Sequence, residues 1–354
     1  MARLGLGEGW SCLYANDFDP VKAATYRANH ADAEAHFRQG DVWAVQPGDL
    51  PGRADLAWAS SPCQDFSLAG ARAGLTGGRS GAFFGFWRLV EALNAHDRAP
   101  RAIVIENVVG LLTSHGGKDF EALCRALAGQ GYRFGALEID AAAFTPQSRP
   151  RVFVIATREQ AGARTGRCGF HSKAITEAHS RLPDPLKASW IWWDLPAPPA
   201  RNTDLSALLE DDGAVTWRSD ADTARLLAQM TPLHRVRLEG AGRTVGAVYR
   251  RTRAGTPQAE VRIDGLAGCL RTARGGSSRQ TIVVSEGGAV RSRLLTPREG
   301  ARLMGLPDSY VLPKGSTAAF HVVGDGVAVP VVRWLSAHLL EPLLRDSVNP
   351  LAAE

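Results

Sequence analysis

Short apolar runs alternate with amphipathic stretches through the first half of the chain. The pattern predicts strands at residues 11–15, 55–59, 102–105, 132–139 and 152–156, and helices at 21–30, 81–95 and 118–128. Strands that alternate with helices are typical of a parallel sheet with helices on both faces. We therefore expect an α/β fold built on a doubly wound, mostly parallel sheet.

The periodicity fades between about residues 162 and 290, where prolines, glycines and arginines are frequent. Helical signals return with Thr296-Pro297-Arg298-Glu299, which combines an N-cap residue, a proline at the first helical position and a glutamate at the third. An apolar helix is predicted from Val327 to about Leu340, with Pro330 in its first turn. We expect a large domain at 1–162, a smaller irregular domain at 163–290, and a C-terminal segment at 291–354 that returns to the first domain.

The composition is that of an ordinary globular protein, with 45% apolar and 22% charged residues among 354. No apolar run approaches the length of a membrane span, and the N-terminus lacks a signal-peptide core. The five cysteines are scattered and odd in number, which argues against a disulfide framework. Cys168 and His171 are the only close Cys/His pair, and one pair does not make a zinc site. We expect no metal, no membrane segment and a cytoplasmic location.

Positive charge is concentrated in one part of the chain. Residues 235–279 hold ten arginines, no lysine and three acids, a local net charge of +7 against +5 for the whole protein. Concentrated arginine is typical of a surface for a phosphate-rich partner. A solvated basic face is an equally good explanation of the charge alone.

A cysteine follows the predicted strand at 55–59, in the sequence Pro62-Cys63-Gln64, and a glycine-rich stretch follows from 70 to 81. Open α/β sheets bind ligands at the carboxyl ends of their strands, and glycine-rich segments can act as lids. This placement suggests a nucleophilic thiol. Taken alone, Cys63 is more often a buried and inert cysteine.

Acids and an aromatic ring stand at other expected strand ends. Asp17 and Phe18 follow the first predicted strand, and they suit a ribose and an adenine ring. Asp41 offers a second acid where another strand would end. Glu106, before Asn107, would be poorly solvated, which favours its protonated form and suits it to share a proton. Each signal is weak when taken singly.

Two arginines precede the strand at 152–156. Arg149 and Arg151 are two residues apart, so on an extended chain their side chains point to the same side. They would then be able to clamp one phosphate or carboxylate. A surface pair of arginines is the alternative.

The ordered combination of Pro62-Cys63-Gln64, Glu106-Asn107-Val108, Gln147-x-Arg149-x-Arg151 and Thr296-Pro297-Arg298-Glu299 resembles the DNA (cytosine-5-)methyltransferases of bacterial or phage type. The resemblance covers nearly the full chain and is weakest at about 165–265. It implies a Rossmann-like methyltransferase domain, a target-recognition domain at 163–290, and S-adenosylmethionine as cofactor. The segment Leu266-Ala267-Gly268-Cys269-Leu270-Arg271-Thr272 resembles the family's turn near the flipped base, with Cys269 as a structural residue.

The resemblance also implies roles for single residues. Cys63 would attack carbon 6 of a flipped-out cytosine, and Glu106 would bind its ring nitrogen and amine. Arg149 and Arg151 would support the flipped nucleotide and the active-site carboxylate. The cofactor-contacting positions would be Asp17, Phe18, Asp41, Val42, Pro62, Asp325 and Val327. The DNA-contacting positions would be Gln64, Ser67, Arg79, Arg250, Arg251, Arg271 and Thr272.

Two features depart from the family pattern. The first strand and the Phe-x-Gly-x-Gly turn of the cofactor site have no counterpart before Met1-Ala2-Arg3, and we expect weaker cofactor binding and stability from a chain that starts there. Gly5-Leu6-Gly7-Glu8-Gly9 is interpreted as a helix end and turn, since no strand precedes it. Asp325 stands where the family commonly has asparagine, and it lacks an amide donor.

The expected partners are double-stranded DNA and a cognate restriction endonuclease, and the protein itself is expected to be a monomer. Two other classes stay open: a DNA-binding relative that is inactive because the cofactor turn is missing, and an RNA cytosine methyltransferase on the same scaffold. A nicotinamide enzyme is the weakest option, because no Gly-x-Gly-x-x-Gly follows a strand.

Overall fold

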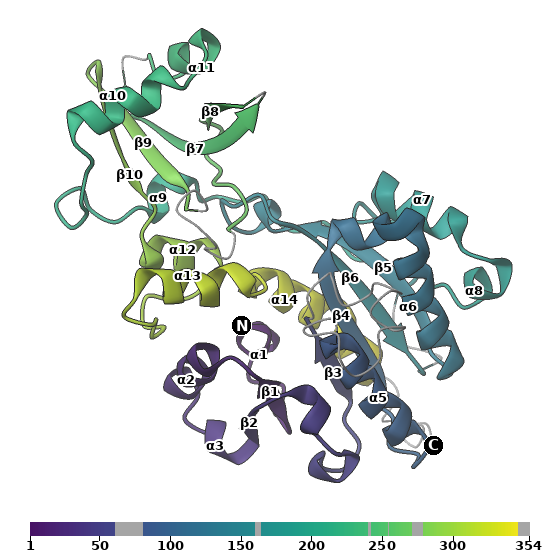
Figure 1. Ribbon diagram of the computed structural model, residues 1–354. Coiled ribbons are helices and arrows are strands. Elements are labelled where there is room, and N and C mark those ends of the chain that lie inside the picture. The colour runs from purple at the N-terminus through teal and green to yellow at the C-terminus, as the bar shows by residue number, and fades with distance from the viewer. Residues whose placement is uncertain (61–80, 160–163, 240–241, 254, 271–278, 346–354) are drawn as a thin grey trace. The chain divides into compact units, whose positions relative to one another are not determined.

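A computed structural model describes residues 1–60, 81–159, 164–239, 242–253, 255–270 and 279–345 (Figure 1). The chain packs as two compact units, which are described separately below. The large unit consists of Ala2–Asp140, Pro150–Pro198 and Val331–Glu354, and the small unit of Met1, Ala141–Arg149 and Pro199–Pro330. This division follows packing. The functional boundaries expected after residues 162 and 290 stay a prediction.

A four-stranded sheet forms the centre of the large unit. Its strands lie in the order β3 (Leu56–Ala59), β4 (Ala102–Val108), β6 (Pro150–Thr157) and β5 (Arg133–Asp140). β3 and β4 are parallel, while β6 is antiparallel to both β4 and β5. Three strands therefore run in one direction and β6 runs in the other, so the sheet is mixed but mostly parallel, as expected.

Helices α5 (Ala82–Asn94) and α6 (Lys118–Gly129) pack on one face of this sheet (Figure 1). On that face, Ile103 and Ile105 of β4 join a core with Phe83, Phe120 and other buried side chains. Alternation along a strand sends the intervening residues to the opposite face. The sequence pattern predicted both helices and the three long strands within a few residues of their observed ends, because each is a long, strongly apolar segment.

Other helical segments of the large unit are shorter. They are α7 (Lys173–Arg181), α8 (Asp184–Ala188), α15 (Glu341–Arg345), the 3₁₀ turns Val42–Ala44, Pro47–Asp49, Val109–Leu112 and Ser114–Gly117, and the π-helical turn Ser336–Leu340. α14 (Val329–Leu335) starts at the boundary of the two units, with Pro330 in its first turn as predicted. The run Ser316–Arg345 is long and apolar enough to cross a membrane, yet 61% of its most apolar window is buried inside the protein, as in a core helix.

The N-terminal part of the large unit contains a separate pair of parallel strands. Its elements are α1 (Ala2–Leu6), β1 (Ala15–Asp17), α2 (Pro20–Asn29), α3 (Ala33–His36) and β2 (Phe37–Gln39). The strand predicted at residues 11–15 was wrong in its start, because the partner strand β2 has only three residues and pairs from Ala15 onward. Gly7 has a φ of 85° directly after α1, which confirms the helix end and turn.

The small unit contains an antiparallel sheet that the sequence pattern did not predict. Its strands are β10 (Ala289–Leu294), β9 (Thr281–Glu286), β7 (Thr244–Arg253) and β8 (Thr256–Arg262), in that spatial order. Its helices are α9 (Leu205–Leu208), α10 (Asp220–Ala228), α11 (Pro232–Val236), α12 (Pro297–Leu303) and α13 (Ser316–Asp325), with a 3₁₀ turn at Ala141–Ala143. Leu226 of α10 packs with Val248, Val261 and Val283 of the sheet.

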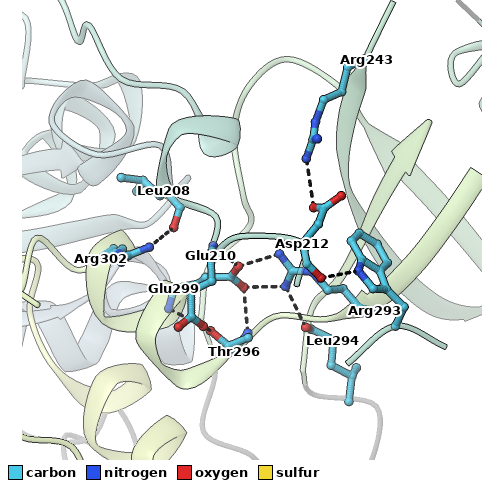
Figure 2. Close-up of polar contacts among 10 residues, drawn as sticks. Leu208, Glu210, Asp212, Arg243, Arg293, Leu294, Thr296, Glu299 and Arg302 are labelled. Atoms are coloured by element: carbon cyan, nitrogen blue, oxygen red, sulfur yellow. Dashed lines mark hydrogen bonds and ion pairs between the residues drawn. The ribbon is translucent and has the colours of Figure 1, made fainter. Parts of the chain in front are cut away.

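A buried ion pair joins the end of the small unit's sheet to α12 (Figure 2). Arg293 donates two hydrogen bonds to the Glu299 carboxylate, at 2.8 and 2.6 Å, and both side chains are 1% exposed. The same carboxylate accepts from the backbone N–H groups of Glu210 and Thr296, both at 2.9 Å. Thr296 in turn caps the helix by accepting from the Glu299 N–H, so the predicted capping box is confirmed.

Candidate active site

The large unit places Glu106 beside Arg151 on one face of its sheet. Glu106 lies opposite Phe153 in the β4–β6 ladder, and Arg151 lies opposite Val108. The glutamate and the arginine are therefore diagonal neighbours on the face away from α5 and α6. The Arg151 Nε atom lies 3.2 Å from Glu106 Oε1, and their side chains are 15% and 8% exposed. The pair is a largely buried carboxylate held by a guanidinium near the carboxyl end of β4.

The structure describes different partners for the two arginines of the motif, Arg149 and Arg151, and their common clamp stays a prediction. Arg149 precedes β6 and belongs to the small unit, where it donates to backbone carbonyls of Leu270, Gly324 and Gly326. Arg151 is already in the strand and pairs with Glu106.

The ends of β1 and β2 carry the residues expected at the nucleoside part of a cofactor. Because these two strands are parallel neighbours, Asp17 and Asp41 follow the same edge of the pair. Asp17 accepts from the Asp19 N–H at 2.9 Å, and Asp41 accepts from the Trp43 N–H at 3.0 Å and caps a 3₁₀ turn. Phe18 follows Asp17 directly in the chain and is 68% exposed.

Close packing brings the turn that contains Val42 against α5. A Cβ atom on Gly85 would lie 2.6 Å from the Val42 side chain, and one on Gly81 would lie 2.5 Å from Trp43 Nε1. Both glycines therefore let the helix approach this turn, which fixes the position of Asp41. Two carboxylates that suit ribose hydroxyls and an exposed ring that suits an adenine face are chemically fitted to S-adenosylmethionine.

The remaining cofactor candidates of the described chain are in the small unit. Asp325 is the last residue of α13, and Val327 follows it and is buried. The carbonyls on both sides of Asp325, those of Gly324 and Gly326, accept from Arg149 Nη2 at 2.8 and 2.7 Å. The segment that carries Asp325 and Val327 is thus held by an arginine far away in the sequence.

Of the predicted DNA contacts, Arg250 is exposed on β7, opposite Ala259 of β8, and the backbone of Arg251 continues the same strand. Seven predicted site residues lie outside the described residues: Pro62, Cys63, Gln64, Ser67, Arg79, Arg271 and Thr272. Among the residues that the structure describes, no group of three or more His, Cys, Asp or Glu side chains is arranged to hold a metal ion.

Sequence reasoning missed how firmly residues 266–270 are held. Gln147, fully buried, accepts from the Leu270 N–H at 3.0 Å and donates to the Leu303 carbonyl at 2.9 Å. Gln280 bonds both the N–H and the carbonyl of Gly268. A Cβ atom on Gly268 would lie 1.8 Å from Tyr249 Oη, so this position requires glycine. The motif Gln-x-Arg-x-Arg pointed to Gln147, but no signal marked Gln280.

Comparison with known proteins gives one consistent result. A family model described as C-5 cytosine-specific DNA methylase matches residues 2–341. The Type II methyltransferase M.HpaII of Haemophilus parainfluenzae is 26% identical over 352 residues, which covers 95% of this chain and 84% of that protein. The Type II methyltransferase M.HhaI of Haemophilus parahaemolyticus is 25% identical over 336 residues, covering 94% and 88%.

Solved structures resemble the chain in fold. The crystal structure of the S. pombe Dnmt2 methyltransferase matches with a TM-score of 0.62 at 19% identity, covering 97% of this chain and 94% of that one. A putative DNA modification methyltransferase encoded within an E. coli prophage matches with a TM-score of 0.53 at 17% identity, covering 97% and 95%. These matches confirm the α/β methyltransferase fold expected from the sequence.

Proposed function

The chain belongs to the C-5 cytosine-specific DNA methylase family and is a DNA (cytosine-5-)methyltransferase, and we propose that it methylates a flipped-out cytosine of double-stranded DNA through a covalent Cys63 adduct. The observation that supports this chemistry is the ion pair of Glu106 and Arg151 near the carboxyl end of β4. A buried carboxylate beside a guanidinium is suited to hold a pyrimidine by its ring nitrogen and amine. Base flipping is needed because carbon 6 cannot be reached inside the base stack.

In the proposed reaction the Cys63 thiolate forms a bond to carbon 6 of the cytosine. Glu106 acts in its protonated form: it donates its proton to the ring nitrogen and is left as the carboxylate that pairs with Arg151, so the electrons of the C5–C6 double bond become available at carbon 5. When bound, S-adenosylmethionine supplies the methyl group that carbon 5 takes up. A base then removes the carbon 5 proton, the C–S bond breaks, and Cys63 leaves as a thiolate while the ring nitrogen loses its proton.

Other residues of the chain would hold the reactants. Arg151 keeps the Glu106 carboxyl group oriented toward the base. Asp17 and Asp41 would bind the ribose hydroxyls, Phe18 would stack on the adenine, and Val42, Pro62, Asp325 and Val327 would line the rest of the cofactor site. The arginine-rich residues of the small unit, with Arg250 exposed on β7, supply positive charge for DNA phosphates. We propose residues 163–290 as the part that contains the target-recognition surface.

The adduct is tested with duplex DNA in which 5-fluorocytosine replaces cytosine, since fluorine cannot leave as a proton does. The wild-type chain with S-adenosylmethionine should give a protein–DNA species stable to denaturant, with a mass equal to the sum of both plus one methyl group. Cys63→Ser should form none and lose at least roughly 10³-fold in methylation rate. Cys168→Ser, at a thiol that lies 3.3 Å from the Trp193 carbonyl and to which no role is assigned, should behave as wild type.

Substrate class is tested in the same assay with labelled cofactor and mixed-sequence DNA or RNA. We expect 5-methylcytosine in duplex DNA. Transfer to RNA alone, or DNA binding with no cofactor binding in calorimetry, would contradict the proposal. A partner restriction endonuclease, a monomeric state and a cytoplasmic location remain predictions.

A further inference from the structure

Arg149 is a buried arginine whose guanidinium group donates to several backbone carbonyls. Its side chain is 3% exposed. Nη1 donates to the Leu270 carbonyl at 2.9 Å and lies 3.3 Å from Cys269 Sγ. Nη2 donates to the carbonyls of Gly324 and Gly326, at 2.8 and 2.7 Å. All of these residues belong to the small unit, so one side chain ties together three segments that are distant in sequence.

The carbonyls at the end of α13 need external donors. The last carbonyls of a helix have no intrahelical partner, and Gly326 leaves α13 with an extended backbone (φ −75°, ψ 168°) instead of the left-handed turn that closes many helices. The two hydrogen bonds from Arg149 satisfy carbonyls there, and a positive charge is favourable at a helix C-terminus. A guanidinium presents five donors in a fixed plane, which lysine does not.

The third carbonyl belongs to a segment that neighbours of Arg149 also hold. Gln147 accepts from the Leu270 N–H, and the backbone of Ser148 donates to the Ala267 carbonyl at 2.9 Å. Both polar groups of the Leu270 backbone are therefore bound by residues 147 and 149. Leu270 comes directly before Arg271, a predicted DNA contact. Residues 147–149 therefore fix the position of the residue that precedes this contact.

We infer that Arg149 is a positioning residue that fixes two functional segments at once, residues 324–327 for the cofactor and residues 266–270 for the DNA. On this view it touches neither the flipped nucleotide nor the reacting atoms, and it acts through the carbonyls that it holds. The assignment of these two segments to cofactor and DNA rests on the proposed function. The claim that Arg149 holds both segments in place does not depend on that function.

Hydrogen exchange of the full chain tests the fixing without any ligand. In Arg149→Met, amides of residues 266–270 and 322–329 should exchange about tenfold faster or more, while β9 is unchanged. Arg149→Lys should fall between Arg149→Met and wild type, because it keeps a charge but loses the planar set of donors. Arg298→Met is the matched control: Arg298 also holds backbone carbonyls in the small unit, those of Pro307 and Tyr310, and its loss should leave both segments protected.

Calorimetry with S-adenosylhomocysteine, and methylation at saturating DNA, test whether Arg149 positions residues 324–327 for the cofactor. Arg149→Met should raise the Kd of S-adenosylhomocysteine roughly tenfold or more and raise KM for the cofactor, with kcat reduced far less. Exchange that stays at the wild-type rate in either segment would overturn the inference. So would an unchanged Kd together with a fall in kcat, because that result places Arg149 at the reacting base. If wild type does not bind S-adenosylhomocysteine, the proposed function fails, and the exchange data still decide the fixing.

Discussion

Each unit of the molecule contains a buried glutamate paired with an arginine, and the two pairs are built differently. In the small unit, Arg293 and Glu299 are 1% exposed and joined by two short hydrogen bonds, and the carboxylate also accepts two backbone N–H groups. In the large unit, Glu106 and Arg151 meet at 3.2 Å and keep 8% and 15% exposure.

The difference between the two pairs indicates how a glutamate–arginine pair with a structural role can be distinguished from one with a chemical role. A carboxylate whose acceptor sites are filled by protein donors has no capacity left for a substrate, so the pair with Glu299 joins elements. The pair with Glu106 lies near the end of a central strand, and both of its side chains are more exposed to solvent than those of the pair with Glu299. The contrast predicts that losing one glutamate harms catalysis and losing the other harms folding.

The largest effect is expected from Glu106→Gln. Since the amide cannot donate the proton that the ring nitrogen needs, methylation should fall by about 10²–10⁴-fold while the chain stays folded. Single-turnover methylation and circular dichroism measure the two properties. The matched control is Glu159→Gln, at the other end of the same sheet, where Glu159 pairs with Arg101 at 2.8 Å. Equal losses of methylation in Glu106→Gln and Glu159→Gln would contradict a chemical role for Glu106.

Glu299→Gln tests the other pair. Removing this charge leaves Arg293 buried without its counter-ion, so the free energy of unfolding should fall by about 3–5 kcal/mol. Methylation per folded molecule, measured below the transition, should stay near wild type. Asp308→Asn is the control, because its pair with Arg302 is largely exposed to solvent and its loss should lower the free energy of unfolding far less. Denaturant titration of both variants would show whether the loss in free energy of unfolding depends on the burial of the ion pair.

A third measurement tests whether the loss of stability at acid pH arises from the ion pairs or from buried histidines. Burial, and then the charge of Arg3, lower the pKa of His30 to about 4 and the pKa of His36 below its ordinary value. The His36 Nε2 atom also lies 3.0 Å from Arg3 Nη1 and 2.9 Å from Tyr26 Oη, an arrangement that needs neutral imidazole.

The unfolded chain therefore binds more protons than the folded chain between the lowered and the ordinary pKa of these histidines. The stability that they contribute is complete above about pH 6.5 and is lost as the pH falls toward 4. We expect a loss of about 1–2 kcal/mol over that window, since the partly exposed His30 ring keeps some of its solvation. His36→Gln should flatten the dependence, and His96→Gln, on the surface, should not. An unchanged slope in a variant that carries both His30→Gln and His36→Gln would attribute the acid sensitivity to the carboxylates instead.

The smallest effect is expected from Phe18→Ala. The exposed ring contributes little to packing, so stability should not change. Loss of stacking on adenine should raise the Kd of S-adenosylhomocysteine by about 2- to 10-fold. Leu13→Ala, another exposed apolar residue of the same segment, should leave the affinity unchanged. Equal affinities for the two variants would remove Phe18 from the cofactor site.

Much of the large unit was predictable because its elements are long and consistently apolar. The helix at 82–94 is rich in apolar residues, and the strands β4, β5 and β6 are nearly continuous buried runs. The four strands of the small unit do not. In β7, Val245, Ala247 and Val248 point to both faces, and arginines follow at the end, so no two-residue alternation marks the strand.

The candidate site was predictable only as far as residue type and strand ends reveal chemistry. Glu106 and Arg151 were identified from motif order, and their diagonal placement needed the β4–β6 register, which the sequence does not contain. The partners of Arg149 are backbone carbonyls more than a hundred residues away, and carbonyls carry no sequence signal.

The assignment of the segment Ala141–Arg149 to the small unit has a consequence for folding during biosynthesis. This segment is made early, between two strands of the large unit, yet its packing partners at 266–270 and 324–326 emerge from the ribosome much later. The small unit therefore cannot complete its packing during translation until more than 320 residues have been made. For the same reason, a recombinant fragment cut at residues 199–330 would lack the Gln147 and Arg149 side chains that hold its own interior.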